Sequence, residues 1–228
     1  MKSQILPPPT IRAESSNWRT LNHCSIIGVP RAFRQWVALC SSMTKRIEKV
    51  TGQCVSVDVL RDASGRIYCE ERNFLDTVQT TGHVREVVLK VGEKALLVAR
   101  TVYVSRWLRT SMKLRTLGTR PLGELLFSHG DALWSKREFS RLTPRLPIFR
   151  LVESAMLCQT RSSWARRTLF LLDGCPILVT EVFLPALLDA ERESKIRCPT
   201  SAGFVIPFPL ALTTSSNNNC NQIVRDKR

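Results

Sequence analysis

The chain has 228 residues and a mass of 25.9 kDa, and its 34 Lys and Arg residues against 19 Asp and Glu residues give a formal net charge of +15. Hydrophobic residues make up 43% of it and charged residues 23%, which is ordinary for a globular protein and excludes wholesale disorder. The uncharged residues 199–224 are interrupted by Pro207 and Pro209, so no membrane-spanning helix is predicted.

Cysteines and charge narrow the class of protein further. The eight cysteines are at least fourteen residues apart, so no CxxC pair begins a metal or redox site, and no signal peptide is evident at the start of the sequence. We therefore expect reduced thiols, no metal and a cytoplasmic protein. A pI of 10.1 is typical of nucleic-acid-binding proteins. The arginines are scattered, however, and no RNP-like motif, KH loop or zinc knuckle accompanies them, so we expect no nucleic-acid partner.

The first sixty residues predict an arm, two helices and a strand. Residues 1–17, rich in proline and serine, predict a flexible arm. A helix follows Pro30, which suits a first turn, and Ser41-Ser42 predicts the cap of a second helix that ends at Gly52. Residues 53–60 alternate in hydrophobicity and predict a half-buried strand. The apolar spacing of the first helix includes Phe33, Trp36, Val37 and Cys40.

Two β-hairpins are predicted farther along the chain. Residues 83–91 and 95–104 flank the short turn 92–94. Residues 164–172 and 175–184 flank Asp173-Gly174, a strong hairpin signal because glycine supplies the positive φ of a primed turn. Between them we expect helical residues from Trp107 to Gly118 and a further helix, LGELLF, after Thr119-Arg120-Pro121.

The remaining segments lack a clear period. Residues 140–163 contain two prolines and predict a loop or an irregular insertion, taken as residues 128–163. After Ala190 the chain becomes polar, so residues 191–228 predict a disordered tail. Hairpins separated by helices predict a single α+β domain, residues 18–190, with one antiparallel sheet.

Two charges fall on strand faces that are otherwise apolar. Arg85 shares its face with Val87, Leu89 and Val91, and Glu181 shares its face with other apolar residues, Ile177, Val179 and Phe183. A buried charge is costly unless it is paired or used. One interpretation is that the two pair with each other, or that the faces are partly solvated.

The other interpretation is that both charged side chains bind a ligand. A guanidinium in a dry pocket can clamp a carboxylate, and a carboxyl group in apolar surroundings can act as an acid, a base or a hydrogen-bond donor. Together they suit a small ligand with a carboxylate at one end and a hydroxyl at the other. Backbone amides at the helix starts, at Leu122 and Met43, favour an anion, although ordinary capping explains these starts equally well.

Five strings occur in an order that resembles a known family. They are SMTKRIE (42–48), VREVVL (84–89), ARTVYV (99–104), LGTRPLGELLF (117–127) and WARRTLFLLDGCPILVTEVFLP (164–185). Together they resemble the chorismate pyruvate-lyases, the 4-hydroxybenzoate synthases of bacterial ubiquinone biosynthesis. The resemblance implies an antiparallel sheet with helical flaps over an internal pocket. It also implies the cofactor-free conversion of chorismate to 4-hydroxybenzoate and pyruvate by a monomer.

The resemblance also implies roles for particular residues. Arg85 matches the family arginine that binds the ring carboxylate, and Met43 and Leu122 match positions that contribute main-chain contacts. Glu181 matches the glutamate at the ring hydroxyl, which gives Arg85 and Glu181 the catalytic positions. The segment from Ser128 to Ser163 is longer than the resemblance predicts.

One alternative comes from another class of protein. Ligand-sensing domains of some bacterial transcription regulators share this lyase-like fold, so a binding module without catalysis would fit the same pattern. Such a sensor normally follows a helix-turn-helix domain, and the stretch before Val29 is too short to hold one, so we expect the enzyme.

Overall fold

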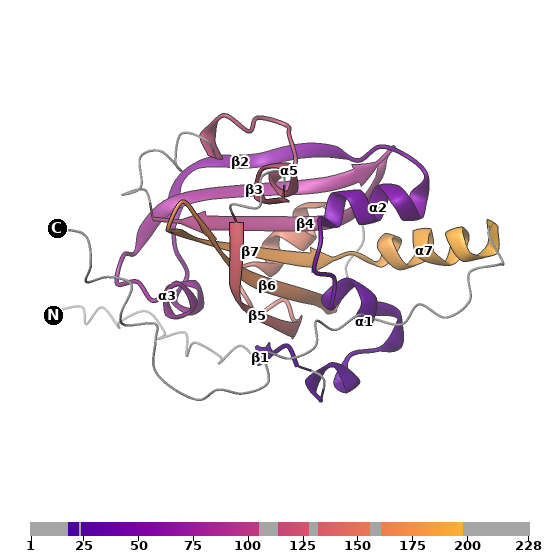
Figure 1. The fold of residues 1–228 in the computed structure, drawn as a ribbon, viewed down its shortest axis with the longest axis horizontal. Coiled ribbons are helices and arrows are strands. Elements are labelled where there is room, and N and C mark those ends of the chain that lie inside the picture. The colour runs from indigo at the N-terminus through magenta and orange to yellow at the C-terminus, as the bar shows by residue number, and fades with distance from the viewer. Residues whose placement is uncertain (1–17, 23, 105–113, 128–131, 156–160, 198–228) are drawn as a thin grey trace, which may run out of the picture.

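The computed structural model describes residues 18–22, 24–104, 114–127, 132–155 and 161–197. Their strands form one antiparallel sheet of seven strands in the order β1-β5-β6-β7-β4-β3-β2 (Figure 1), which confirms the predicted α+β fold. The strands are β1 (Arg19–Thr20), β2 (Ser56–Arg66), β3 (Thr81–Val91), β4 (Lys94–Tyr103), β5 (Ala132–Leu142), β6 (Ser163–Leu172) and β7 (Cys175–Phe183). The helices are η1 (Ser25–Gly28), α1 (Arg31–Val37), α2 (Met43–Thr51), α3 (Cys69–Leu75), α5 (Leu122–Phe127), α6 (Phe149–Ala155) and α7 (Pro185–Arg197).

Both predicted hairpins are confirmed. β3 pairs with β4 and β6 pairs with β7, each across a short turn. Asp173 and Gly174 both have positive φ, 50° and 74°, as a primed two-residue turn requires. This turn fixes the register in which Leu172 lies opposite Cys175, and the same register places Arg166 opposite Glu181.

The helix boundaries follow local capping. The hydroxyl of Ser42 accepts a hydrogen bond from the backbone N–H of Lys45, and Gly52 ends α2 with a φ of 70°. Both ends of α2 are therefore as predicted. Pro30 is the N-cap of α1, and that helix ends at Val37, so the predicted extension to Cys40 is wrong. Cys40 is exposed, so its position is not one of the buried apolar positions of the helix.

The sheet has two differently covered faces. On one face, α1, α2 and α7 bury a cluster with the apolar side of β3, β4 and β7, centred on the fully buried Trp36 and Ile47. α5 packs on the same face near Phe170. On the other face, α3 and α6 cover Val84, Val88 and their neighbours. We call these the pocket face and the opposite face.

The irregular insertion predicted at residues 128–163 is wrong for the part that the structure describes. Residues 132–142 form β5, which pairs with both β1 and β6, and residues 149–155 form α6. The β5 sequence is hard to identify because it carries charges on both faces. A register shift between Trp134 and Lys136, together with partners for Arg137 and Glu138, lets those charges lie in the sheet.

Two predicted boundaries also differ from the structure. The domain does not end at Ala190, because α7 continues to Arg197 and the carboxylate of Glu191 accepts a hydrogen bond of 2.8 Å from the Trp36 indole. The strand predicted at residues 53–60 begins at Ser56 and continues to Arg66 past a register shift between Val59 and Arg61. The predicted N-terminal arm, residues 198–228 of the tail and the helical residues from Trp107 to Lys113 lie outside the described residues. Within the described part of the chain, none of the helices has the length and apolar character needed to cross a membrane.

Candidate active site

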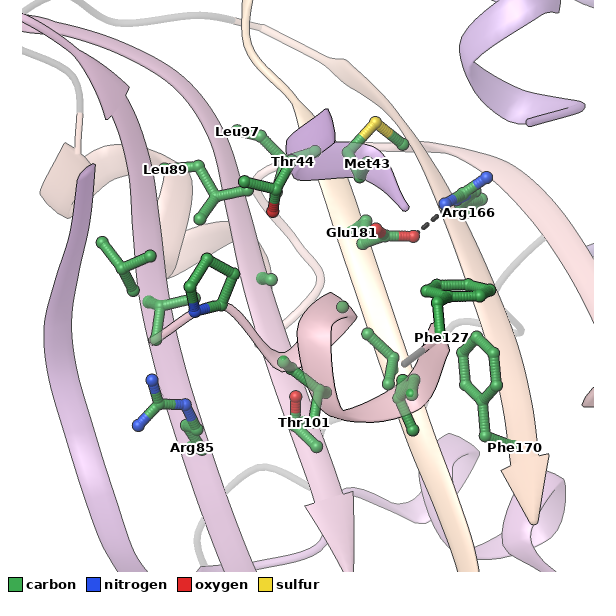
Figure 2. A pocket seen from close by; sticks show the side chains of 18 residues that line it. Met43, Thr44, Arg85, Leu89, Leu97, Thr101, Phe127, Arg166, Phe170 and Glu181 are labelled. Carbon is green, nitrogen blue, oxygen red and sulfur yellow. Dashed lines mark hydrogen bonds and ion pairs between the residues drawn. The ribbon is translucent and has the colours of Figure 1, made fainter. Parts of the chain in front are cut away.

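One cavity on the pocket face collects the residues that the sequence singles out. It has a volume of about 60 Å³ and lies between the sheet, the start of α2 and the whole of α5 (Figure 2). Met43, Arg85, Leu122 and Glu181 all line it. Most of the remaining lining is apolar: Val57, Val87, Leu89, Leu97, Ala99, Leu126, Phe127, Phe170 and Val179. Charged groups in such a cavity act in a setting with little water, where electrostatic interactions are stronger.

Arg85 is held in place by three groups. Its side chain is 4% exposed, and its Nη1 donates to Oδ2 of Asp62 at 2.7 Å. Its Nη2 donates to the carbonyl oxygens of Gly118 and Arg120, at 2.7 and 3.4 Å, in the segment that leads into α5. These contacts fix the plane of the guanidinium, so that a ligand carboxylate meets a preorganised donor.

Glu181 is held from the neighbouring strand. Its Oε2 accepts a 2.5 Å hydrogen bond from Nε of Arg166, which lies in β6 directly opposite Glu181 (Figure 2). Arg85 and Glu181 therefore have separate partners, and the interpretation that they pair with each other is wrong.

The strand register sets the separation of Arg85 and Glu181. Arg85 lies opposite Thr101 of β4, and Thr101 lies opposite Val179 of β7, two residues before Glu181. Two strand spacings and two residues along a strand separate their Cα atoms by about 12 Å. With both side chains extending over the same face, the gap between their charged ends suits a ligand the size of one substituted ring.

The starts of α2 and α5 meet above this gap. A Cβ on Gly123 would lie 2.8 Å from the hydroxyl of Ser42, so glycine is needed for the two helix starts to approach so closely. Met43 and Leu122 are the first residues of these helices, where backbone N–H groups have no partner within the helix. Their amides therefore lie near one another at the cavity wall.

Four polar residues of the site were not selected from the sequence: Asp62, Arg166, Thr44 and Thr101. Asp62 holds Arg85, Arg166 holds Glu181, and Thr44 lines the cavity beside Met43 (Figure 2). A signal for Arg166 was present, since the Asp173-Gly174 turn alone fixes its position opposite Glu181. Asp62 carried no such signal, because only the register shift in β2 brings it opposite Arg85.

The fold and this cavity define a class of protein. A buried guanidinium and a buried carboxylate face one apolar pocket on an antiparallel sheet, and helix starts close over it. This arrangement suits a protein that encloses a small aromatic or cyclic carboxylate.

Sequence comparison identifies the family. The model of the chorismate lyase family matches residues 14–193, so the chain belongs to that family of lyases. A probable chorismate pyruvate-lyase of Thiobacillus denitrificans is 34% identical over 160 residues, which cover 70% of this chain and 86% of that protein. Another, from Nitrosomonas europaea, is 37% identical over 169 residues, which cover 72% of this chain and 93% of that protein.

Two solved structures show a distant likeness. The effector domain of PhnF from Mycobacterium smegmatis matches 64% of this chain and 90% of its own length, with 13% identity and a TM-score of 0.48. A protein from Staphylococcus aureus matches 64% of this chain with 12% identity and a TM-score of 0.44. Likeness at this level carries no argument about function.

Proposed function

We propose that this chain is a chorismate pyruvate-lyase, which converts chorismate to 4-hydroxybenzoate and pyruvate. The observation that carries the proposal is the shared cavity, with Arg85 at one end, Glu181 at the other and the first residues of α2 and α5 between them. Membership of the chorismate lyase family and the similarity to probable chorismate pyruvate-lyases support the same reaction.

Binding of the ring follows from the two ends of the cavity. Arg85 and the amides of Met43 and Leu122 bind the ring carboxylate, because a fixed guanidinium and free N–H groups are its natural donors. Glu181 binds the 4-hydroxyl. The apolar lining packs against the ring and excludes water, which aligns the ether for departure and limits side reactions.

The reaction is an elimination that needs no redox partner. The bond between C3 and the ether oxygen breaks, and its electron pair leaves with the enolpyruvate. The C4 proton is removed, its electron pair forms the C3–C4 double bond, and the ring becomes aromatic. Glu181 assists this proton transfer in our proposal, and the enolate is protonated on carbon to give pyruvate. Atoms and charge balance without a cofactor, so we propose that none is used.

The proposed setting follows from the reaction. The product 4-hydroxybenzoate enters ubiquinone biosynthesis, and we propose that the chain catalyses the first committed step of that pathway in the cytoplasm, as a monomer. Neither a membrane nor a nucleic acid is a partner in this proposal.

A direct assay tests the proposed function. Purified protein is incubated with chorismate, pyruvate is measured with coupled lactate dehydrogenase, and 4-hydroxybenzoate is measured by chromatography. Equal amounts of both products are expected, and Arg85→Ala should chiefly weaken substrate binding. Absence of pyruvate would leave a ligand-binding domain without catalysis. Turnover of Glu181→Gln close to that of the unmodified protein would remove its acid–base role.

A further inference from the structure

The Glu181 end of the cavity holds more positive than negative charge. Arg137 of β5 and Arg166 of β6 are 4% and 3% exposed. Both donate through Nη1 to the same carbonyl oxygen, that of Leu39, at 2.8 and 2.6 Å. Glu181 is the carboxylate that contacts Arg166. Two buried guanidiniums therefore lie at this end of the cavity with one carboxylate, which contacts Arg166.

Arg137 has no carboxylate partner within the part of the chain that the structure describes. Its other contacts are the hydroxyl of Thr168 at 3.0 Å, the sulfur of Cys40 at 3.8 Å and the ring of Trp134. Burial, and after it the neighbouring charge of Arg166, lower the pKa of Arg137 to about 10, while Cys40 and Glu181 act in the opposite direction. At neutral pH the guanidinium is still charged, and within the described residues no carboxylate contacts it.

Arg166 connects this charge to the cavity. It lines the cavity together with Glu181, whereas Arg137 lies behind it and is not part of the lining. Its Nε donates to Glu181, and its Nη1 donates to the carbonyl oxygens of Trp36 and Leu39. Its Nη2 has no partner among the described residues, which leaves one end of the guanidinium fork for a ligand.

We infer that Arg166 binds a second carboxylate of the ligand, the one on the enolpyruvyl side chain, and that Arg137 supplies the charge which compensates it. The inference rests on the proposed function. Chorismate carries this side chain on C3, next to the C4 hydroxyl that Glu181 contacts, so the second carboxylate arrives beside Glu181. With Glu181 alone there, two carboxylates would repel each other. With Arg137 and Arg166, the occupied site is neutral.

Arg85 does not serve this second carboxylate. It lies at the other end of the cavity, about 12 Å away between Cα atoms by the strand spacing.

The same arrangement assists the departure of the side chain. When the C3–O bond breaks, the leaving enolpyruvate carries both its carboxylate and the electron pair on the former ether oxygen. A fixed guanidinium next to that oxygen stabilises the developing charge more than it stabilises the neutral ether. Arg166 is thus a catalytic residue in this inference, and Arg137, which acts through it, is a positioning residue.

Two stable aromatic ligands distinguish binding of the side-chain carboxylate from binding of the ring carboxylate. 4-Hydroxybenzoate has the ring carboxylate and the hydroxyl, and 3-(carboxymethoxy)-4-hydroxybenzoate adds a side-chain carboxylate on C3. Neither can undergo the elimination, so both can be titrated by calorimetry. The readout is the ratio of their dissociation constants, which a general loss of folding or of ring binding does not change.

The chain offers a matched control in the next residue of the same strand. Arg167 is 8% exposed and bound to one glutamate, Glu138, but it lies on the opposite face. Arg166→Gln should weaken the dicarboxylate at least about 30-fold more than it weakens 4-hydroxybenzoate. Arg167→Gln should leave the ratio within about twofold, because it does not reach the ligand. Arg137→Gln should also weaken the dicarboxylate more than it weakens 4-hydroxybenzoate, but by a smaller factor than Arg166→Gln.

The possible outcomes distinguish failure of this inference from failure of the proposed function. Parallel weakening of both ligands in Arg166→Gln would overturn the inference, even if the unmodified protein releases pyruvate from chorismate. A selective loss for the dicarboxylate in a protein without turnover would support the second carboxylate site and overturn the proposed function. If Arg166→Gln does not fold, Arg166→Lys keeps the charge but removes the planar fork, and an unchanged ratio in both Arg166→Lys and Arg137→Gln would also overturn the inference.

Discussion

Arg166 and Arg167 are adjacent in β6, both are buried and each contacts one glutamate, but they lie on opposite faces of the sheet and have different surroundings. Arg167 donates through Nε and Nη2 to Glu138 at 2.9 and 2.6 Å, and the rings of Trp18 and Phe74 cover its guanidinium. Arg166 donates only Nε to Glu181, and its other bonds go to backbone carbonyl groups.

This difference between Arg166 and Arg167 indicates two roles for buried arginines: some stabilise the fold, and others are available to bind a ligand. On the opposite face Arg100 has two carboxylates, Glu71 and Glu86. Burial lowers the pKa of Arg100, but the hydrogen bond and charge of Glu71 outweigh it, so the pKa lies above its usual value. Charge there is compensated within the protein. At the Glu181 end of the pocket face, we propose that an anionic ligand completes the compensation.

The largest effect is expected from breaking the compensated pair. Glu138→Leu leaves the Arg167 guanidinium buried without its carboxylate and should lower the free energy of unfolding by about 3–5 kcal/mol. Urea denaturation followed by circular dichroism measures the loss. Adding Arg167→Met should recover most of it, because two apolar residues replace a buried pair at little cost. A single-variant loss below about 1 kcal/mol would show that Arg167 finds water or another partner.

The second prediction compares the affinity for 4-hydroxybenzoate after replacement of one arginine on each face, Arg85 and Arg100. Arg85→Met should weaken 4-hydroxybenzoate binding by about 2–5 kcal/mol, or at least about 30-fold, because a buried charged donor to the carboxylate is lost. Asp62 is 21% exposed and keeps His83 as a neighbour, so the loss of stability should be smaller. Calorimetric titration measures the affinity.

Arg100→Met is the control for that comparison. It leaves Glu71 buried without its main partner, so stability should fall, but the folded protein should bind 4-hydroxybenzoate within about threefold of the unmodified affinity. Equal losses of affinity in Arg85→Met and Arg100→Met would contradict the division of roles between the two faces.

The third effect concerns α7, which supports Arg166 from a distance. The indole of Trp36 donates to Glu191, and the carbonyl of Trp36 accepts from Arg166. A chain that stops after Ala190 loses Glu191 and should be less stable by about 1–3 kcal/mol, since a buried donor loses its acceptor. A chain that stops after Arg197 is the control and should keep the unmodified stability. Thermal unfolding of both chains, measured side by side, tests this; equal midpoints would show that α7 beyond Ala190 contributes nothing.

The sheet and its pocket-facing charges could be predicted because period-2 patterns and a two-residue turn are local signals. Arg85 and Glu181 stood out as charges on apolar faces, and the Asp173-Gly174 turn fixed one hairpin register. Counting back from the turn along β6 places Arg166 opposite Glu181. The position of Arg166 could therefore have been predicted from the same local signal.

The rest depended on contacts between segments distant in sequence. Asp62 reaches Arg85 only through a shift in β2 that no local pattern encodes. β5 resembled a loop because Arg137 and Glu138 are charged, and their partners, Thr168 and Arg167, lie 31 and 29 residues away. The end of the domain was placed too early because Glu191 is polar, while its partner Trp36 lies 155 residues before it. Buried polar pairs conceal a strand or a helix from a hydrophobicity pattern.

The smallest effect is confined to alkaline pH and uses the two tyrosines, one on each face. Burial raises the pKa of Tyr103, on the pocket face, to about 12, although Arg115 opposes the shift. Burial also raises the pKa of Tyr68, on the opposite face, against the charge of Arg100, whose guanidinium lies 4.1 Å from its ring. An unfolded tyrosine ionises near pH 10, so the stability from each buried phenol is complete below that pH and is lost as the pH rises toward the folded pKa.

For Tyr103 this linkage amounts to about 1.4 kcal/mol at pH 11, where the unfolded phenol is mostly ionised and the folded one is not. Tyrosinate absorbance should therefore develop above pH 10 in the folded protein, and Tyr103→Phe should remove the contribution of Tyr103 while leaving that of Tyr68. The phenol of Tyr103 belongs to the support of Arg85, since its ring stacks on His83 at 5.0 Å and His83 contacts Asp62. If bound 4-hydroxybenzoate rigidifies that support, it should delay the Tyr103 titration and leave Tyr68 unchanged. An equal delay of both would mean that the two faces respond to the ligand as one unit.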